Sequence, residues 1–237
     1  MTQPAKGSSS AMEALYPFLY ASTSDLSDVL AQVRASTVAK VEEIAELRRT
    51  VAAREAARLA NCAEDMAARF AAGGRLFAFG NGGSATDAQE LATLFLNPGQ
   101  GKTPLPAFAL ANDTSVVTAL CNDIEVGVVF ARQLAAFGRR EDIAVGLSTS
   151  GNSDNLLRAF AEASRRGMLG VGLAGYEGGK MGEADTIDCL FVAPSSSVHR
   201  IQEAQTTMYH VLWELTLASL DRRQATSRQG KASQEPQ

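Results

Sequence analysis

The sequence contains little cysteine and no long hydrophobic run. Its three cysteines are far apart in 237 residues, so they fit neither a disulfide framework nor the paired cysteines of a structural zinc site. No stretch approaches the roughly 20 consecutive apolar residues that a membrane-spanning helix needs. The first residues also lack the charged segment and apolar run of a secretory signal. These absences predict a cytoplasmic protein with reduced thiols and no membrane contact.

An excess of positive charge is also missing. Lysine and arginine number 22 against 26 acidic residues, which gives a net charge of -4. A surface that neutralises a nucleic-acid backbone normally shows clustered basic residues, so we expect no direct contact with nucleic acid. The hydrophobic fraction of 46% and the charged fraction of 20% are ordinary for a globular protein. A chain of this length can bury one substantial core.

Proline is absent from residue 18 to residue 72, where alanine, leucine, glutamate and arginine dominate. Apolar residues recur there at helical intervals, as in Val38, Val41, Ile44 and Leu47. This part of the chain therefore predicts two or more helices. Both ends are polar, and we expect an N-terminal extension over 1–34 that is partly disordered, a domain over 35–220, and a disordered tail over 221–237.

The pattern of residues changes at Gly73, after which short apolar runs alternate with segments that have helical periodicity. The runs end in glycine-rich or polar turns, and five of them are present: 76–79, 107–110, 143–147, 169–174 and 189–192. Nearly continuous apolar strands separated by helices are typical of a parallel sheet covered on both faces. The predicted fold is α/β: a doubly wound parallel five-stranded sheet flanked by helices, with N-terminal helices before it and a last helix over about 198–220.

Two loops of small residues, 80–84 (GNGGS) and 148–153 (STSGNS), follow two of these strands. In a doubly wound sheet both loops lie at the carboxyl ends of the strands, where helix N-termini present unpaired N–H groups to a ligand. Together they indicate an anion site suited to a phosphate. The alternatives are a plain glycine turn for the first loop and a helix cap for the second. Neither loop has the spacing of a dinucleotide or nucleoside triphosphate site, so no nucleotide cofactor is expected.

Three segments carry a resemblance to a known family: FAFGNGGSATDAQELA, LSTSGNSDNLLRAF and HRIQEAQTTMYH. They resemble the sugar isomerase (SIS) family over about 35–220, and within it the phosphoheptose isomerases and the related DnaA initiator-associating proteins. The resemblance implies a SIS fold and an aldose-ketose isomerase that acts on sedoheptulose 7-phosphate or a related ketose phosphate. It also implies a homotetramer with active sites at subunit interfaces.

By position, the resemblance assigns roles to individual residues. The substrate-binding set is Asn81, Gly82, Gly83, Ser84, Asn112, Asp113, Ser148, Thr149, Ser150, Ser153 and Gln202. Gln202 and His210 match the family's metal-binding or catalytic glutamine and histidine. Zinc is the cofactor that these matches imply.

One helix departs from the family pattern. Glu90 stands where the family has a histidine metal ligand, and Leu94 stands where it has the catalytic glutamate. Isomerisation needs a base next to the substrate carbonyl, and leucine cannot act as one. Glu90 precedes Leu94 by one helical turn, so its carboxylate can serve as the base or as a metal ligand. We therefore expect Glu90 and His210 to be catalytic, and Glu90, Gln202 and His210 to be the metal ligands if zinc binds.

The plainer alternatives are a solvated Glu90, a core or interface histidine at 210, and a glutamine at 202 that bonds across an interface. Two functions remain open at this point. The first is a sugar-phosphate isomerase, and the second is a phosphosugar-binding or protein-interaction module without turnover, resembling the DnaA initiator-associating proteins. A DNA-binding regulator fits the acidic composition poorly.

Overall fold

The structure is a computed structural model that describes residues 26–232, and it begins with a single long helix, α3, over Leu26–Ala71. The expectation of two or more helices was wrong within this range. Neither glycine nor proline occurs from residue 26 to residue 72, and the segment is rich in strong helix formers, so nothing interrupts the backbone hydrogen bonding. The helix ends before Gly73, which has a φ of +84°.

The chain divides into two compact units, 1–43 and 44–237. The described part of the first unit is the amino-terminal portion of α3. Its side chains are exposed throughout 27–43, and they include five aliphatic residues with exposed fractions of 42 to 60%: Val29, Leu30, Val33, Val38 and Val41. The second unit contains all the elements that follow, together with the part of α3 from Ile44 onward.

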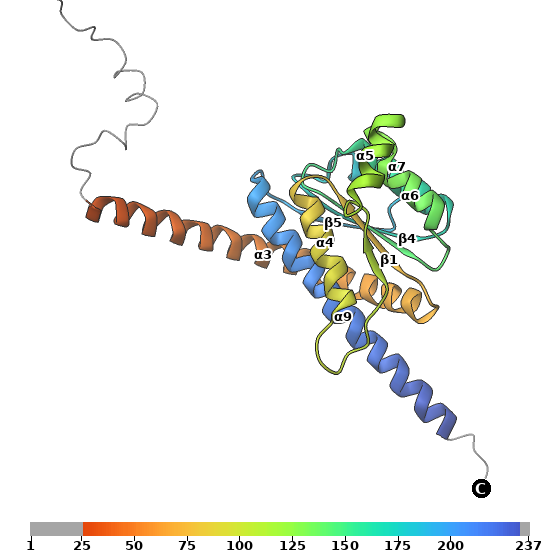
Figure 1. Ribbon diagram of the computed structural model, residues 1–237. Helices are drawn as coiled ribbons and strands as arrows, with labels where there is room; N and C mark the ends of the chain where they lie inside the picture. Colours follow the sequence, from red (N-terminus) through yellow and green to blue (C-terminus); the bar gives the residue numbers. More distant parts are fainter. Residues whose placement is uncertain (1–25, 233–237) are drawn as a thin grey trace, which may run out of the picture. The chain divides into compact units, whose positions relative to one another are not determined.

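Within residues 26–232 the strands form one parallel five-stranded sheet, as the sequence predicts (Figure 1). The strands are β1 (Leu76–Gly80), β2 (Ala107–Ala109), β3 (Ile143–Ser148), β4 (Leu169–Gly175) and β5 (Cys189–Ala193). Their spatial order is β2-β1-β3-β4-β5. β1 and β3 are therefore neighbours, and Gly80 lies opposite Leu147 at their carboxyl ends.

Helices cover both faces of the sheet, which confirms the doubly wound prediction. The helices after α3 are α4 (Gly83–Leu96), α5 (Thr114–Asp123), α6 (Val129–Phe137), α7 (Asp154–Arg165), α8 (Gly179–Glu183) and α9 (Val198–Ala232), and a 3₁₀ turn occupies Val126–Val128. The core on one face joins α4, α9 and α3 from Ile44 onward to alternate strand residues such as Ala78. The core on the other face joins α6 and α7 to the intervening residues, such as Phe77 and Phe79.

The last helix is longer than the sequence predicts. α9 continues through Ala232, whereas a tail was expected from residue 221; residues 233–237 and 1–25 lie outside the described part. Residues 221–229 contain neither glycine nor proline, and Arg222 pairs with Glu64 of α3 at 2.5 Å. The polar composition of this segment therefore does not prevent α9 from continuing through it. None of the described helices is both long and apolar enough to cross a membrane.

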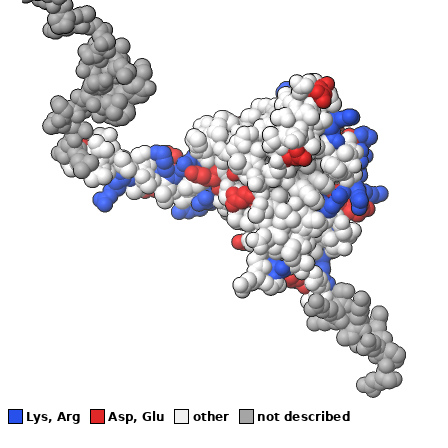
Figure 2. Space-filling model, in the orientation of Figure 1, with Lys and Arg blue, Asp and Glu red and all other residues white. Residues whose placement is uncertain are grey.

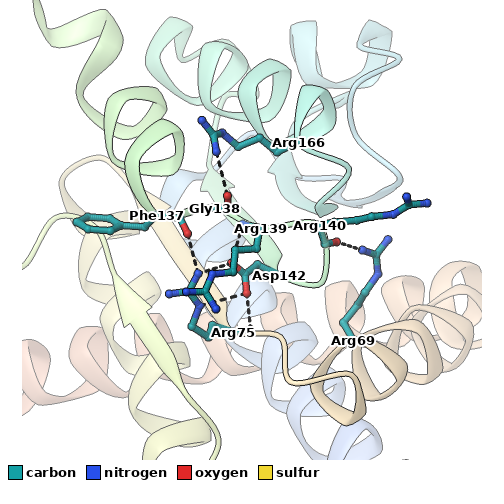
Figure 3. Close-up of polar contacts among 8 residues, drawn as sticks. All are labelled: Arg69, Arg75, Phe137, Gly138, Arg139, Arg140, Asp142 and Arg166. Carbon is teal, nitrogen blue, oxygen red and sulfur yellow. Dashed lines mark hydrogen bonds and ion pairs between the residues drawn. The ribbon is translucent and has the colours of Figure 1, made fainter.

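A polar network ties together the amino ends of the strands, away from the two loops (Figure 3). Asp142, which immediately precedes β3, is buried, with 1% of its side chain exposed. It accepts hydrogen bonds from the backbone N–H of Arg75 at 2.8 Å, from the Arg75 guanidinium at 3.2 and 2.7 Å, and from the backbone N–H of Arg139 at 2.9 Å. Arg75 also donates to the carbonyl of Phe137 at 2.6 Å. One carboxylate thus connects the starts of β1 and β3 with the end of α6.

Candidate functional site

The two small-residue loops lie side by side because they follow neighbouring strands. Residues 81–82 join β1 to α4, and residues 149–153 join β3 to α7. Their link is a reciprocal amide pair between Asn81 and Asn155, with N···O distances of 2.9 and 2.8 Å. The expected convergence of the loops is present, whereas the role of Asn155 in holding them together could not be predicted from a local pattern.

The first loop brings backbone N–H groups close to α9. Gly82 has a φ of +56°, a conformation that favours glycine. A Cβ on Gly83 would lie 2.5 Å from the side-chain nitrogen of Gln202, so a larger residue at this position would displace the Gln202 side chain. Among the described residues no side chain caps the N-terminus of α4. The N–H groups of Ser84 and Ala85 instead donate to the carbonyls of Asn81 and Gly82 at 3.0 Å, and the amino end of α4 lies next to the Gln202 amide.

The second loop folds around its own hydroxyl groups. The backbone N–H of Gly151 donates to Ser148 Oγ at 3.1 Å, and Ser148 Oγ lies 3.2 Å from Ser153 Oγ. Ser150 Oγ accepts from the N–H of Asn152 at 3.2 Å. Ser153 occupies the N-cap position of α7, yet within the described structure its side chain makes no capping hydrogen bond. A simple helix cap therefore does not explain this loop, and the amino end of α7 keeps free donors for an anion.

Asn112 and Asp113 follow β2, the edge strand next to β1, and both are exposed. Asp113 caps α5, because its Oδ1 accepts from the N–H of Val116 at 3.0 Å. The topology brings both residues to the same edge of the sheet as the loops.

The acid-base candidates meet across α4 and α9. Glu90 Oε1 lies 3.2 Å from His210 Nε2, and the other oxygen, Oε2, accepts a hydrogen bond from the hydroxyl of Tyr209 at 2.7 Å. Half of the Glu90 side chain and 38% of the His210 side chain are exposed, so both remain within reach of a ligand. The expectation that His210 faces Glu90 is met by this geometry. Tyr209 was missed, because a tyrosine in an apolar helix is usually core.

A second carboxylate on α4 was also missed. Asp87 lies one turn before Glu90 and accepts from Gln202 Nε2 at 3.1 Å. Burial raises the pKa of the Asp87 carboxyl, whereas the hydrogen bond from Tyr209 lowers the pKa of the Glu90 carboxyl. Glu90 is therefore not the sole carboxylate on this face of the helix. The spacing of three residues between Asp87 and Glu90 was the available signal.

Leu94 lies where the sequence comparison places it, one turn after Glu90. Both residues line a shallow groove on the outer face of α4, together with Thr86, Gln89, Thr93 and Asn97. Leu94 is half-buried and packs against the core beneath α4. The position offers an apolar wall to the groove and no proton-transferring group.

The residues expected to bind zinc do not form a complete ligand set. Glu90 and His210 are suitable donors, and Gln202, whose amide nitrogen donates to Asp87, could offer its carbonyl oxygen. Residues 26–232 contain no group of three or more His, Cys, Asp or Glu side chains placed to hold a metal ion. A catalytic zinc site uses three protein ligands and a structural one uses four. The histidine and acidic side chains of the described residues therefore do not by themselves complete either kind of site.

Comparison with known proteins bears on the family. The SIS domain family matches residues 41–175. The phosphoheptose isomerase of Desulfovibrio desulfuricans is 46% identical over 173 residues, which are 73% of this chain and 81% of the relative. The phosphoheptose isomerase structure from Neisseria gonorrhoeae aligns with a TM-score of 0.72 and 33% identity, over 78% of this chain and 98% of that one.

The phosphoheptose isomerase structure from Francisella tularensis aligns with a TM-score of 0.69 and 29% identity, over 83% of this chain and all of that one. These alignments cover most of this chain. The sheet order, the paired loops and the extent of the match lead to one conclusion: the chain belongs to the SIS domain family.

Proposed function

We propose that this protein is a cytoplasmic aldose-ketose isomerase of the phosphoheptose isomerase type that acts on sedoheptulose 7-phosphate or a related ketose phosphate. One observation carries the proposal. The serine loop, which no side chain caps, and the Glu90–His210 pair belong to elements that meet at one edge of the sheet. The relatives named above support the same reaction class. We place the domain that performs it at 35–220.

In the proposed complex the phosphate lies at the amino end of α7. Its partners are the backbone N–H groups of that loop and the hydroxyls of Ser148, Thr149, Ser150 and Ser153. The remaining polar residues of the site bind the sugar hydroxyls: Asn81, Gly82, Gly83, Ser84, Asn112, Asp113 and Gln202. The two kinds of contact divide the ligand into a charged end and a neutral end, which sets its direction in the site.

Glu90 acts as the base in the proposed reaction. Its carboxylate removes a proton from the carbon next to the carbonyl, and the C–H electron pair forms a carbon-carbon double bond. The carbonyl electron pair moves to its oxygen, which takes a proton from His210. The other hydroxyl of the resulting enediol then gives its proton to His210 and becomes the new carbonyl, while Glu90 returns its proton to the former carbonyl carbon, so both residues are regenerated with no net change in oxidation.

A turnover assay of the wild type tests the proposal. Sedoheptulose 7-phosphate and other ketose phosphates are supplied with and without added zinc, and binding is measured by calorimetry on the same samples. Isomerisation of one of them supports the proposal. Activity that appears only with added zinc would show that the donor set is completed by some other group.

Leu94 favours one other function, a phosphosugar-binding module without turnover. A groove with an apolar residue in place of a base binds a ligand but does not transfer its protons. Binding of a sugar phosphate with no isomerisation in that assay would establish this second function and exclude the first.

Phosphate affinity should depend on the serine loop. Replacing Ser148 and Ser150 together by alanine removes two hydroxyl partners of the anion, each hydrogen bond to a charged group contributing roughly 1.5 to 3 kcal/mol. We expect calorimetry with a sugar phosphate to show affinity reduced by tens of fold or more. Ser164→Ala, at the exposed far end of α7, is the matched control. Unchanged affinity in a folded double variant would show that the loop serves the fold alone.

We propose a homotetramer, because the exposed aliphatic residues of α3 give it an apolar surface in the single chain. Light scattering should give about four times the chain mass of 25.0 kDa. Val33→Glu combined with Val41→Glu should lower that mass, whereas Ala35→Glu, which points to another side of the helix, should not. A monomer mass that is independent of concentration would contradict the proposal.

A further inference from the structure

We infer that Tyr209 is a positioning residue that fixes the Glu90 carboxylate for proton transfer; this inference rests on the isomerase function proposed above. The two partners differ in mobility. Glu90 has a half-exposed side chain, and a free glutamate of this kind samples several rotamers. Tyr209 is fully buried in α9 and is among the largest buried side chains of the described structure. Its hydroxyl therefore offers the carboxylate a fixed point.

The geometry assigns a different task to each oxygen of Glu90. Tyr209 and His210 are consecutive, so they leave the α9 axis about 100° apart and approach the carboxylate from two directions. Tyr209 bonds Oε2 at 2.7 Å, and His210 lies 3.2 Å from Oε1. With Oε2 held by the tyrosine, Oε1 stays beside the histidine that would protonate the substrate oxygen. The hydroxyl thus selects the orientation in which base and acid act together.

The surroundings keep Tyr209 in this role. Its ring stacks on that of His210, with centroids 5.3 Å apart. Burial raises the pKa of the Tyr209 phenol, so the hydroxyl keeps its proton and remains a hydrogen-bond donor. Phenylalanine fills the same space without a donor. That substitution therefore separates the hydrogen bond from the packing.

Tyr209→Phe should lower kcat for the isomerised sugar phosphate by about 10- to 100-fold, because misplacing a catalytic group by about 1 Å has effects of this size. KM should change by less than about twofold, since the phosphate is held at the serine loop. Thr216→Val is the matched control: it removes another buried hydroxyl of α9, which donates to the carbonyl of Leu212 at 2.6 Å, and should leave both constants unchanged.

A double-mutant cycle distinguishes positioning from a general structural effect. Glu90→Asp keeps a carboxylate but withdraws it from Tyr209 by one methylene, so in that background Tyr209→Phe should have no further effect on kcat. Equal losses in both backgrounds, or a wild-type kcat in the single variant, would overturn the inference while leaving the isomerase standing. A wild type that never isomerises a sugar phosphate would instead overturn the proposed function and this inference with it. Should Tyr209→Phe fail to fold, Tyr209→Met is carried through the same cycle.

Discussion

Replacing Glu90 with glutamine should lower isomerase turnover by at least a hundredfold and leave phosphate affinity nearly unchanged. A positioned acid-base group typically contributes 10²- to 10⁴-fold, and glutamine keeps the shape of the side chain but cannot accept the proton. The proposed phosphate partners lie at the amino end of α7, whereas Glu90 belongs to α4. Steady-state kinetics and calorimetry on the same preparation measure the two effects separately.

Asp87→Asn is the matched control for this prediction, because Asp87 is the other carboxylate of α4. An amide at this position can still bond to Gln202, and we expect turnover to fall less than it does in Glu90→Gln. If Asp87→Asn has the larger effect, Asp87 is the base and Glu90 is not. Glu90→His combined with Leu94→Glu restores the family pattern, and activity in that variant but not in the wild type would favour the binding module.

The second large effect concerns stability. Asp142→Ala should reduce the free energy of unfolding by about 3 to 5 kcal/mol, because it leaves the Arg75 guanidinium without its carboxylate in a mostly buried network. It also removes the acceptor of two backbone N–H groups, those of Arg75 and Arg139. For a chain of this size the loss corresponds to a fall in the melting temperature of roughly 6 to 20 °C.

Glu46→Gln provides the control for Asp142→Ala. Glu46 pairs with Arg49 at 3.0 Å, but 72% of the glutamate and 73% of the arginine side chain are exposed. Exposed pairs contribute about 0 to 1 kcal/mol, so the melting temperature should hardly change. Calorimetric melting of all variants at one protein concentration gives the comparison, since assembly shifts apparent stability. Equal effects of the two substitutions would refute the role assigned to Asp142.

The sheet and both loops could be predicted from the sequence because short local patterns of residues indicate them. Each strand appears as a short apolar run, and the loops follow two of them directly. The ends of the helices were harder to predict from the sequence. Polar residues at 221–232 looked like a tail, although nothing in their backbone chemistry prevents helix, and α3 continues through a segment in which several helices were expected.

What the sequence did not reveal depends on partners distant in the chain. Glu90 and Tyr209 are 119 residues apart, and their hydrogen bond exists because α4 and α9 pack on the same face of the sheet. Arg75 and Asp142 are separated by 67 residues and meet because β1 and β3 pair out of sequence order. No pattern of neighbouring residues encodes such contacts. These hydrogen bonds and ion pairs could therefore be identified only from the three-dimensional structure.

Two of the helices that pack on one face of the sheet come from opposite ends of the domain sequence: α3, from Ile44 onward, and α9. During synthesis this face therefore stays incompletely covered until the residues of α9 have left the ribosome, although α3 and α4 are already present, whereas α6 and α7 can cover the opposite face much earlier. A chain released before residue 198 would expose apolar strand residues to other nascent chains and would be prone to aggregate. It would also lack Gln202, Tyr209 and His210. The candidate site and this core are thus completed at the same late stage of synthesis.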